Sequence, residues 1–135
     1  MLPRKRYDDT TKFADLQGET LIRIDQDGQE ILRFITNSGR AFVLFHSQNC
    51  CETVEIESII GDLDDLINTP ILLAEEATSE EDPEGFTPDK DFYRNDSQTW
   101  TFYKLRTIKG SVDIRWYGSS NGYYSESVDF MEERK

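Results

Sequence analysis

The sequence has little histidine, little cysteine and no long apolar run. It contains one histidine and two cysteines in 135 residues, which leaves few side chains for a metal or thiol centre. No apolar run approaches the roughly 20 residues that a membrane-spanning helix needs. No apolar stretch follows the charged segment Met1 to Tyr7 either. We therefore expect no membrane association and no secretory signal peptide.

Basic residues are also scarce relative to acidic ones. The chain carries 15 Lys and Arg against 27 Asp and Glu, a formal net charge of −12. Phosphate contacts need Lys and Arg, so this balance disfavours binding to duplex nucleic acid. Eleven of the acids and only one base lie between Gly61 and Asp91, so this segment alone carries −10. The charge is therefore a local feature on a nearly neutral background.

The length and the aromatic content predict one folded domain. A chain of 135 residues fits a single domain, and aromatic residues make up 12% of it, which argues against disorder. We therefore assign residues 1–135 to one domain. Within it we expect a flexible N-terminal arm over residues 1–12, an acidic surface loop over 78–98 and a polar tail over 131–135.

Alternation of apolar and polar residues predicts antiparallel strands over most of the chain. Asp27-Gly28 is a hairpin turn signal, and it separates the apolar segments Thr20–Ile24 and Gln29–Thr36. Both faces of Arg40–His46 are apolar, so we expect this strand to lie centrally. Further strands are expected over Thr53–Glu57, Ile71–Ala74, Thr99–Thr107, Ser111–Tyr117 and Tyr123–Phe130, the last three as a meander.

One segment shows helical rather than strand spacing. Between Ser58 and Ile67 the apolar residues recur at helical intervals, and Pro70 follows shortly after. The predicted fold class is therefore α+β: a mainly antiparallel, curved sheet of about six or seven strands with one short helix.

A first candidate site gathers metal-ligand types at the end of a predicted strand. It consists of His46, Cys50, Cys51 and Glu52, and zinc takes sulfur, nitrogen and oxygen ligands of this kind. Adjacent α-carbons lie about 3.8 Å apart, below the usual disulfide range, so we expect Cys50 and Cys51 to be free thiols. Either cysteine could also act as a nucleophile with His46 as base. The alternative is two small buried cysteines and a hydrogen-bonded histidine.

A second candidate site combines aromatic rings with cationic side chains on the last predicted strands. Rings can stack on a flat ligand, and guanidinium or ammonium groups can pair with phosphate or carboxylate. The same residue types are good strand formers, so a purely structural role is the alternative. The candidate ligand-binding residues are Tyr103, Lys104, Arg115, Trp116, Asn121 and Tyr123.

Two stretches of sequence carry a family resemblance over roughly residues 40 to 130. The first runs from Cys50-Cys51-Glu52 to the Gly61–Ile67 segment, and the second joins the Thr99–Lys104 segment to the Ile114–Ser125 segment. Together they resemble a family of short phage and bacterial proteins that carry a domain of unknown function. The resemblance implies a cytoplasmic setting and a phage or prophage origin, but no established chemistry.

We therefore predict a small non-enzymatic binding protein without a cofactor. It would act on a host factor or sequester a nucleotide-like small molecule, as a host-defence antagonist. One alternative is an acidic decoy that imitates nucleic acid and blocks a basic host protein surface. Another is a metal- or thiol-dependent enzyme centred on His46, Cys50 and Cys51. The oligomeric state stays open, and self-association is one outcome.

Overall fold

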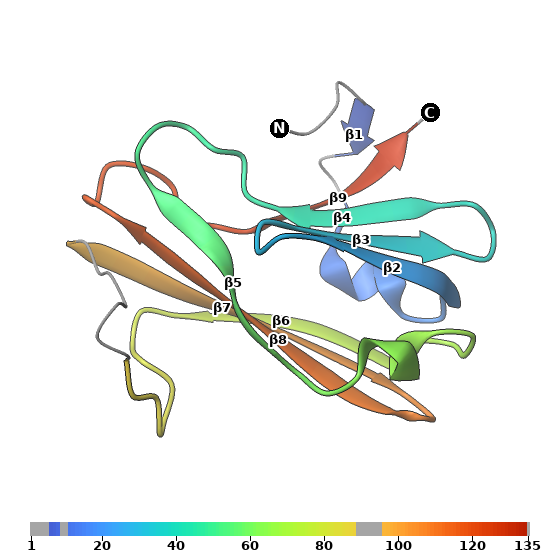
Figure 1. Ribbon diagram of the computed structural model, residues 1–135. Coiled ribbons are helices and arrows are strands. Elements are labelled where there is room, and N and C mark those ends of the chain that lie inside the picture. The colour runs from blue at the N-terminus through green and yellow to red at the C-terminus, as the bar shows by residue number, and fades with distance from the viewer. Residues whose placement is uncertain (1–5, 9–10, 89–95, 135) are drawn as a thin grey trace.

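Two antiparallel β-sheets pack face to face around one hydrophobic core (Figure 1). The computed structural model describes residues 6–8, 11–88 and 96–134. The first sheet has the strand order β1-β9-β4-β3-β2, and the second has the order β5-β8-β7-β6. The strands are β1 (Arg6–Asp8), β2 (Leu21–Asp27), β3 (Ile31–Thr36), β4 (Ala41–Phe45), β5 (Thr53–Ile60), β6 (Leu73–Ser79), β7 (Ser97–Thr107), β8 (Gly110–Ser120) and β9 (Asp129–Arg134). Two short 3-10 helices, η1 (Phe13–Leu16) and η2 (Leu63–Leu66), complete the described elements.

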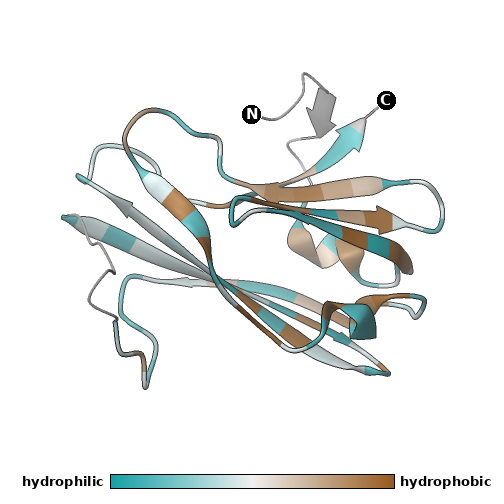
Figure 2. Ribbon diagram, viewed as in Figure 1, coloured by the Kyte–Doolittle hydropathy of each residue, from teal (hydrophilic) through white to brown (hydrophobic). Residues whose placement is uncertain are grey.

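The core forms because strands from both sheets turn an apolar face inward. From the first sheet, Phe42 and Phe130 stack with ring centroids 5.5 Å apart, and from the second, Ile114 and Trp116 are almost fully buried. The hydrophobic colour in Figure 2 accordingly concentrates on β3, β4 and β5. β4 lies between β9 and β3, and its residues 42–45 are all buried. This confirms the central place predicted for Arg40–His46.

The fold is mostly β rather than α+β, and it has two sheets rather than one curved sheet. The short helix or helical turn predicted over Ser58–Ile67 is confirmed only over the four residues of η2, because β5 continues to Ile60. A register shift between Ile56 and Ser58 breaks the simple alternation that marks a strand. Short apolar runs of this kind are ambiguous between helix and strand.

The C-terminal strand joins the opposite sheet from the one predicted. The sequence predicts that Tyr123–Phe130 closes a meander beside β8, but β9 begins at Asp129 and pairs with β4 and β1. Residues 131–134, which lie in the predicted polar tail over 131–135, continue β9 to Arg134. The chain passes from the second sheet to the first between β8 and β9, because Phe130 is then buried among Phe13, Phe34 and Phe42.

The acidic loop is shorter than predicted and partly anchored. β6 runs to Ser79 and β7 begins at Ser97, so the connection spans residues 80–96. Asp82 accepts hydrogen bonds from Trp100 Nε1 and Gln98 Nε2, both at 3.1 Å. Phe86 packs edge-on against Trp100 at 4.9 Å. The described start of this loop therefore folds back over the sheet.

The expected N-terminal arm over residues 1–12 is described only in part. Arg6–Asp8 form β1, which pairs with β9, whereas residues 1–5 and 9–10 lie outside the described residues. No helix in the described part of the chain is long and apolar enough to cross a membrane.

Candidate functional site

The predicted ligand-binding residues occupy three separate places rather than one site. Tyr103 and Trp116 point into the core between the sheets and are 1% and 0% exposed. Burial, with the nearby Glu76 carboxylate, raises the pKa of Tyr103 above its usual range, so the phenol stays neutral. Neighbouring residues of a strand point to opposite faces, so Lys104 and Arg115 lie on the outer face of the same sheet.

The two remaining members of the set lie beyond the end of β8. Asn121 and Tyr123 are exposed in the β8–β9 connection. The Asn121 side-chain oxygen accepts a hydrogen bond from Tyr123 N at 3.0 Å, which closes a local turn. The Tyr123 ring packs edge-on against Tyr124. These residues therefore form a turn of their own and do not extend the sheet surface.

Lys104 and Arg115 instead line a hollow of about 430 Å³ on the outer face of the second sheet. We call it the outer-face hollow. Two rows of paired residues cross the strands there: Ala77, Phe102 and Arg115 form one, and Glu75, Lys104, Asp113 and Ile60 form the other. Directly paired residues of antiparallel strands share a face, so the register itself builds the hollow. Its lining therefore combines apolar and charged side chains.

The Arg115 side chain is held rigidly at the margin of this hollow. Its guanidinium donates two hydrogen bonds to Glu57, at 2.6 and 3.0 Å. It also lies over the rings of Trp100 and Phe86, at 5.3 and 5.6 Å from their centroids. The hydrogen bonds from Arg115 lower the pKa of Glu57 despite partial burial. Arg115 is therefore already neutralised by a carboxylate in the free protein.

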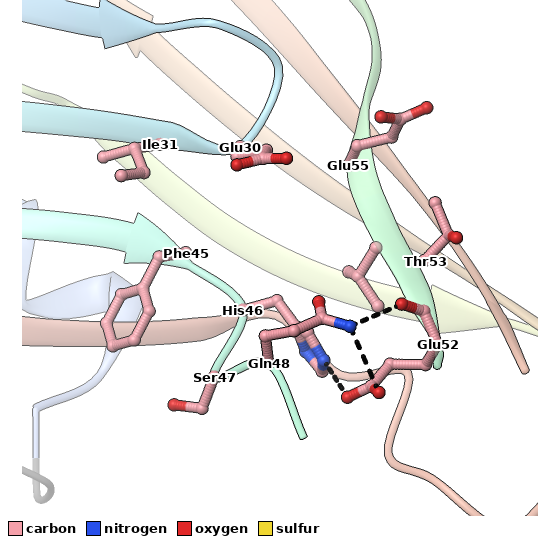
Figure 3. A pocket seen from close by; sticks show the side chains of 10 residues that line it. Glu30, Ile31, Phe45, His46, Ser47, Gln48, Glu52, Thr53 and Glu55 are labelled. Carbon is pink, nitrogen blue, oxygen red and sulfur yellow. Dashed lines mark hydrogen bonds and ion pairs between the residues drawn. The ribbon is translucent and has the colours of Figure 1, made fainter. Parts of the chain in front are cut away.

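A larger pocket of about 670 Å³ lies where β4 and β5 approach the β2–β3 turn (Figure 3). We call it the His46 pocket, and Ile31, Phe45 and Val54 supply its apolar lining. Glu52 is 3% exposed there, and His46 Nε2 lies 2.7 Å from its carboxylate. The other ring nitrogen, Nδ1, lies 2.6 Å from the Ser127 carbonyl oxygen.

The Glu52 carboxylate closes the loop between β4 and β5. Besides His46, the backbone N–H groups of Asn49 and Cys50 donate to it at 2.9 Å, and the Gln48 amide donates at 3.3 Å. Burial opposes ionisation, but the donors outweigh it and hold the pKa of Glu52 at about 2. Both ring nitrogens of His46 therefore lie against oxygen atoms, one of a carboxylate and one of a carbonyl.

The expectation of free thiols is wrong, because Cys50 and Cys51 form a disulfide between neighbouring residues. The chain bends at both positions, so two side chains that would diverge along a strand come together. This bond removes the proposed thiol nucleophile in the structure described. Among the described residues, no group of three His, Cys, Asp or Glu side chains is arranged to hold a metal ion. Of the four predicted metal ligands, His46 and Glu52 therefore contact each other, and Cys50 and Cys51 form the disulfide.

Two residues of the outer-face site were missed from the sequence. Phe102 lies two residues before Lys104, so the alternation of a strand places both side chains on one face. This alternation was the signal that could have predicted Phe102 as part of the site. Glu57 had no comparable signal, because the bulge between Ile56 and Ser58 re-aims its side chain toward Arg115.

Comparisons with known proteins give a family but no function. The family model of a domain of unknown function (DUF7448) matches residues 14–130, in agreement with the resemblance to a family of unknown function. Neither the search of curated proteins nor the search of solved structures found a match.

Proposed function

Because the chain belongs to the DUF7448 family, a domain of unknown function, we propose its function from its own surface: it is a non-enzymatic binding protein. The outer-face hollow carries this proposal. Its lining offers apolar side chains at Phe102 on β7 and at Ile60 on β5, and Ile60 is 61% exposed. Apolar surface flanked by charged groups is typical of interaction sites.

A protein partner fits this hollow better than a nucleotide-like anion. Lys104 lies between Glu75 and Asp113 in the cross-strand row, and Arg115 is already paired with Glu57. A phosphate approaching either cation would therefore meet carboxylates as well. An apolar side chain from a protein, ringed by its own polar groups, meets no such conflict. The family resemblance to phage and bacterial proteins makes a host protein the proposed partner and host defence the proposed context.

Matched substitutions of two exposed isoleucines test this proposal. Ile60→Glu places a charge in the hollow, whereas Ile108→Glu places one in the β7–β8 turn, where Ile108 is 82% exposed. In affinity capture from bacterial lysate, a specific protein should be retained by the wild type and by Ile108→Glu. Capture by Ile60→Glu should fall at least ~10-fold, as expected for an interface centre. Equal capture by both variants would contradict the proposal.

Calorimetry with nucleotides provides the complementary test. We expect no heat of binding when ATP, GTP or cyclic AMP is titrated into the protein. Binding that Lys104→Ala weakens would instead make the nucleotide-like ligand the better assignment.

The second candidate is an acidic decoy, and the exposed acids after β6 favour it. Glu80, Glu81 and Glu84 are exposed on the loop that follows this strand, where they could steer a basic surface. A decoy binds through charge alone. Its association should slow when these acids become glutamine, and high salt should abolish it. Partner binding that persists in high salt and depends on Ile60 would favour the hollow instead.

A further inference from the structure

The outer edge of β6 presents main-chain groups that none of the described strands pairs with. β6 is an edge of the second sheet, with β7 on its other side. Ala74 N donates to the Gln17 side chain at 3.1 Å, so the N–H of Ala74 points away from β7. In an antiparallel ladder the direction alternates, so the main-chain groups of Glu76 and Thr78 also point outward. Among the described residues, none bonds to them from that side.

Two of the other sheet edges, those formed by β5 and β2, have main-chain partners. On the opposite edge of the same sheet, Ile56 N of β5 donates to the Gln29 carbonyl at 2.6 Å. In the other sheet, the Leu21 carbonyl of β2 accepts from Asn68 N at 2.8 Å. Proteins commonly cover their edges because a free edge is a template for another strand. The exposed stretch from Glu75 to Thr78 departs from this pattern.

Hollows flank this edge on both faces of the sheet. Glu75 and Ala77 face the outer-face hollow. On the inner face, Ala74 and Glu76 line a second hollow of about 660 Å³ with Phe13, which we call the Phe13 hollow. Side chains of an added strand alternate between the faces. Consecutive residues of such a strand would therefore enter the two hollows in turn.

The charge of the edge selects the strand that it would accept. Glu75 and Glu76 are both exposed on β6, and the loop that follows is acidic. A second copy of this chain would bring the same acids against them, so self-pairing is disfavoured. Because Glu75 and Glu76 lie on opposite faces of the sheet, lysine or arginine at alternate positions of an added strand would complement Glu76, and apolar residues between them would enter the outer-face hollow.

We infer that the free edge of β6 takes up an extended, basic segment of a partner protein as an added β-strand. Main-chain hydrogen bonds to Glu76 and Thr78 give the affinity, and the two hollows select alternate side chains. This inference rests on the proposed binding function and names how the partner is held.

A capped hexapeptide of alternating lysine and valine tests the inference directly. In the wild-type protein it should shift the NMR signals of the Glu76 and Thr78 amides and slow their hydrogen exchange. The same peptide with N-methyl groups on alternate residues keeps its charge and side chains but loses donors. It should bind at least ~10-fold more weakly, because strand addition depends on main-chain bonds.

Variants of the protein provide the matched controls. Thr78→Pro removes an outward N–H without removing a bond to β7, a change that edge strands tolerate. It should weaken binding of the peptide at least ~10-fold. Glu76→Gln should weaken it more than Glu30→Gln, which removes an exposed acid at the β2–β3 turn. If Thr78→Pro fails to fold, the pair of peptides still decides the question.

Three results would overturn the inference. They are equal binding of the N-methylated peptide, absence of binding by the unmodified one, and a dimer in sedimentation that Thr78→Pro dissolves. Equal binding of the N-methylated peptide would mean that charge attraction alone holds the peptide. A dimer that Thr78→Pro dissolves would mean that a second copy of this chain occupies the β6 edge. None of them affects capture that depends on Ile60, so the proposed function fails or stands separately.

Discussion

At the scale of single residues, Glu52 shows how a polar side chain becomes structural. Its carboxylate receives two backbone N–H groups, the Gln48 amide and the His46 ring. A buried charge is tolerated only when it is paired and hydrogen-bonded. The residue types that indicated a metal or thiol centre therefore serve to close the β4–β5 loop.

Glu52→Gln should destabilise the protein strongly. The amide cannot satisfy the donors that the carboxylate accepts, so we expect the free energy of unfolding to fall by about 2 to 4 kcal/mol. Urea unfolding measures it. Glu55→Gln, on strand β5 just after this loop, is the control and should change the value by less than ~0.5 kcal/mol. A small effect at position 52 would mean that the loop is held by other contacts.

The pH dependence follows from the same side chain. The pKa of Glu52 is about 2 in the folded protein, against an ordinary value of 4.5. A lowered folded pKa contributes stability that is complete above the unfolded pKa and is lost as pH falls. The stability difference between wild type and Glu52→Gln should therefore shrink from about pH 5 toward pH 2. A difference that stays constant across this range would contradict the assignment.

Residue-level prediction failed where it ignored the faces of a strand. Arg115 and Trp116 are neighbours, so one had to face the core if the other faced outward. Alternation correctly divided these strands into faces, but grouping by chemistry alone put both faces into one site. Of the predicted set, Lys104 and Arg115 share a face, and the structure brings them together with Phe102, which was not predicted.

At the scale of elements, local pattern predicted strands well but could not predict their partners. β4 was recognisable because apolar residues occupy both of its faces. The pairing of β9 with β4 joins residues far apart in the chain, such as Leu44 and Phe130. Local periodicity carries no information about such pairs. The extension of β6 past Ala74 was hidden for another reason, because its exposed acids resemble a loop.

The junction between β5 and η2 supplies a test at this scale. Gly61 has a φ of +112°, and an added Cβ would lie 2.5 Å from the Ser111 carbonyl oxygen. Gly39 also has a positive φ, +88°, but open space around it. We expect Gly61→Ala to cost about 3 kcal/mol, from strain and overlap together.

Gly39→Ala should cost about 1 kcal/mol, from strain alone. Urea unfolding of both variants makes the comparison. Equal losses would show that the β8 backbone can move away from position 61 without cost.

At the scale of the whole molecule, the net charge of −12 acts on stability as well as on partners. Excess charge of one sign destabilises a compact state by self-repulsion. Cross-strand ion pairs oppose this effect, such as Arg33 with Glu133 at 2.6 Å and Arg40 with Glu132 at 3.0 Å. Salt screens both the repulsion between acids and the attraction within ion pairs. The net effect of salt on stability therefore shows which of the two is larger.

We expect repulsion to dominate, because an exposed pair such as Arg40 with Glu132 contributes only about 0 to 1 kcal/mol. Arg33 with Glu133 is a single partly buried pair, whereas the acids are concentrated in one part of the sequence. Raising the salt concentration should therefore raise the urea midpoint of the wild type. A variant with glutamine at Glu80, Glu81 and Glu84 should be more stable at low salt and gain less from added salt. A midpoint that falls with salt would mean that the ion pairs outweigh the repulsion. The acidic segment would then not strain the fold, and its exposure would need no compensation by a basic partner.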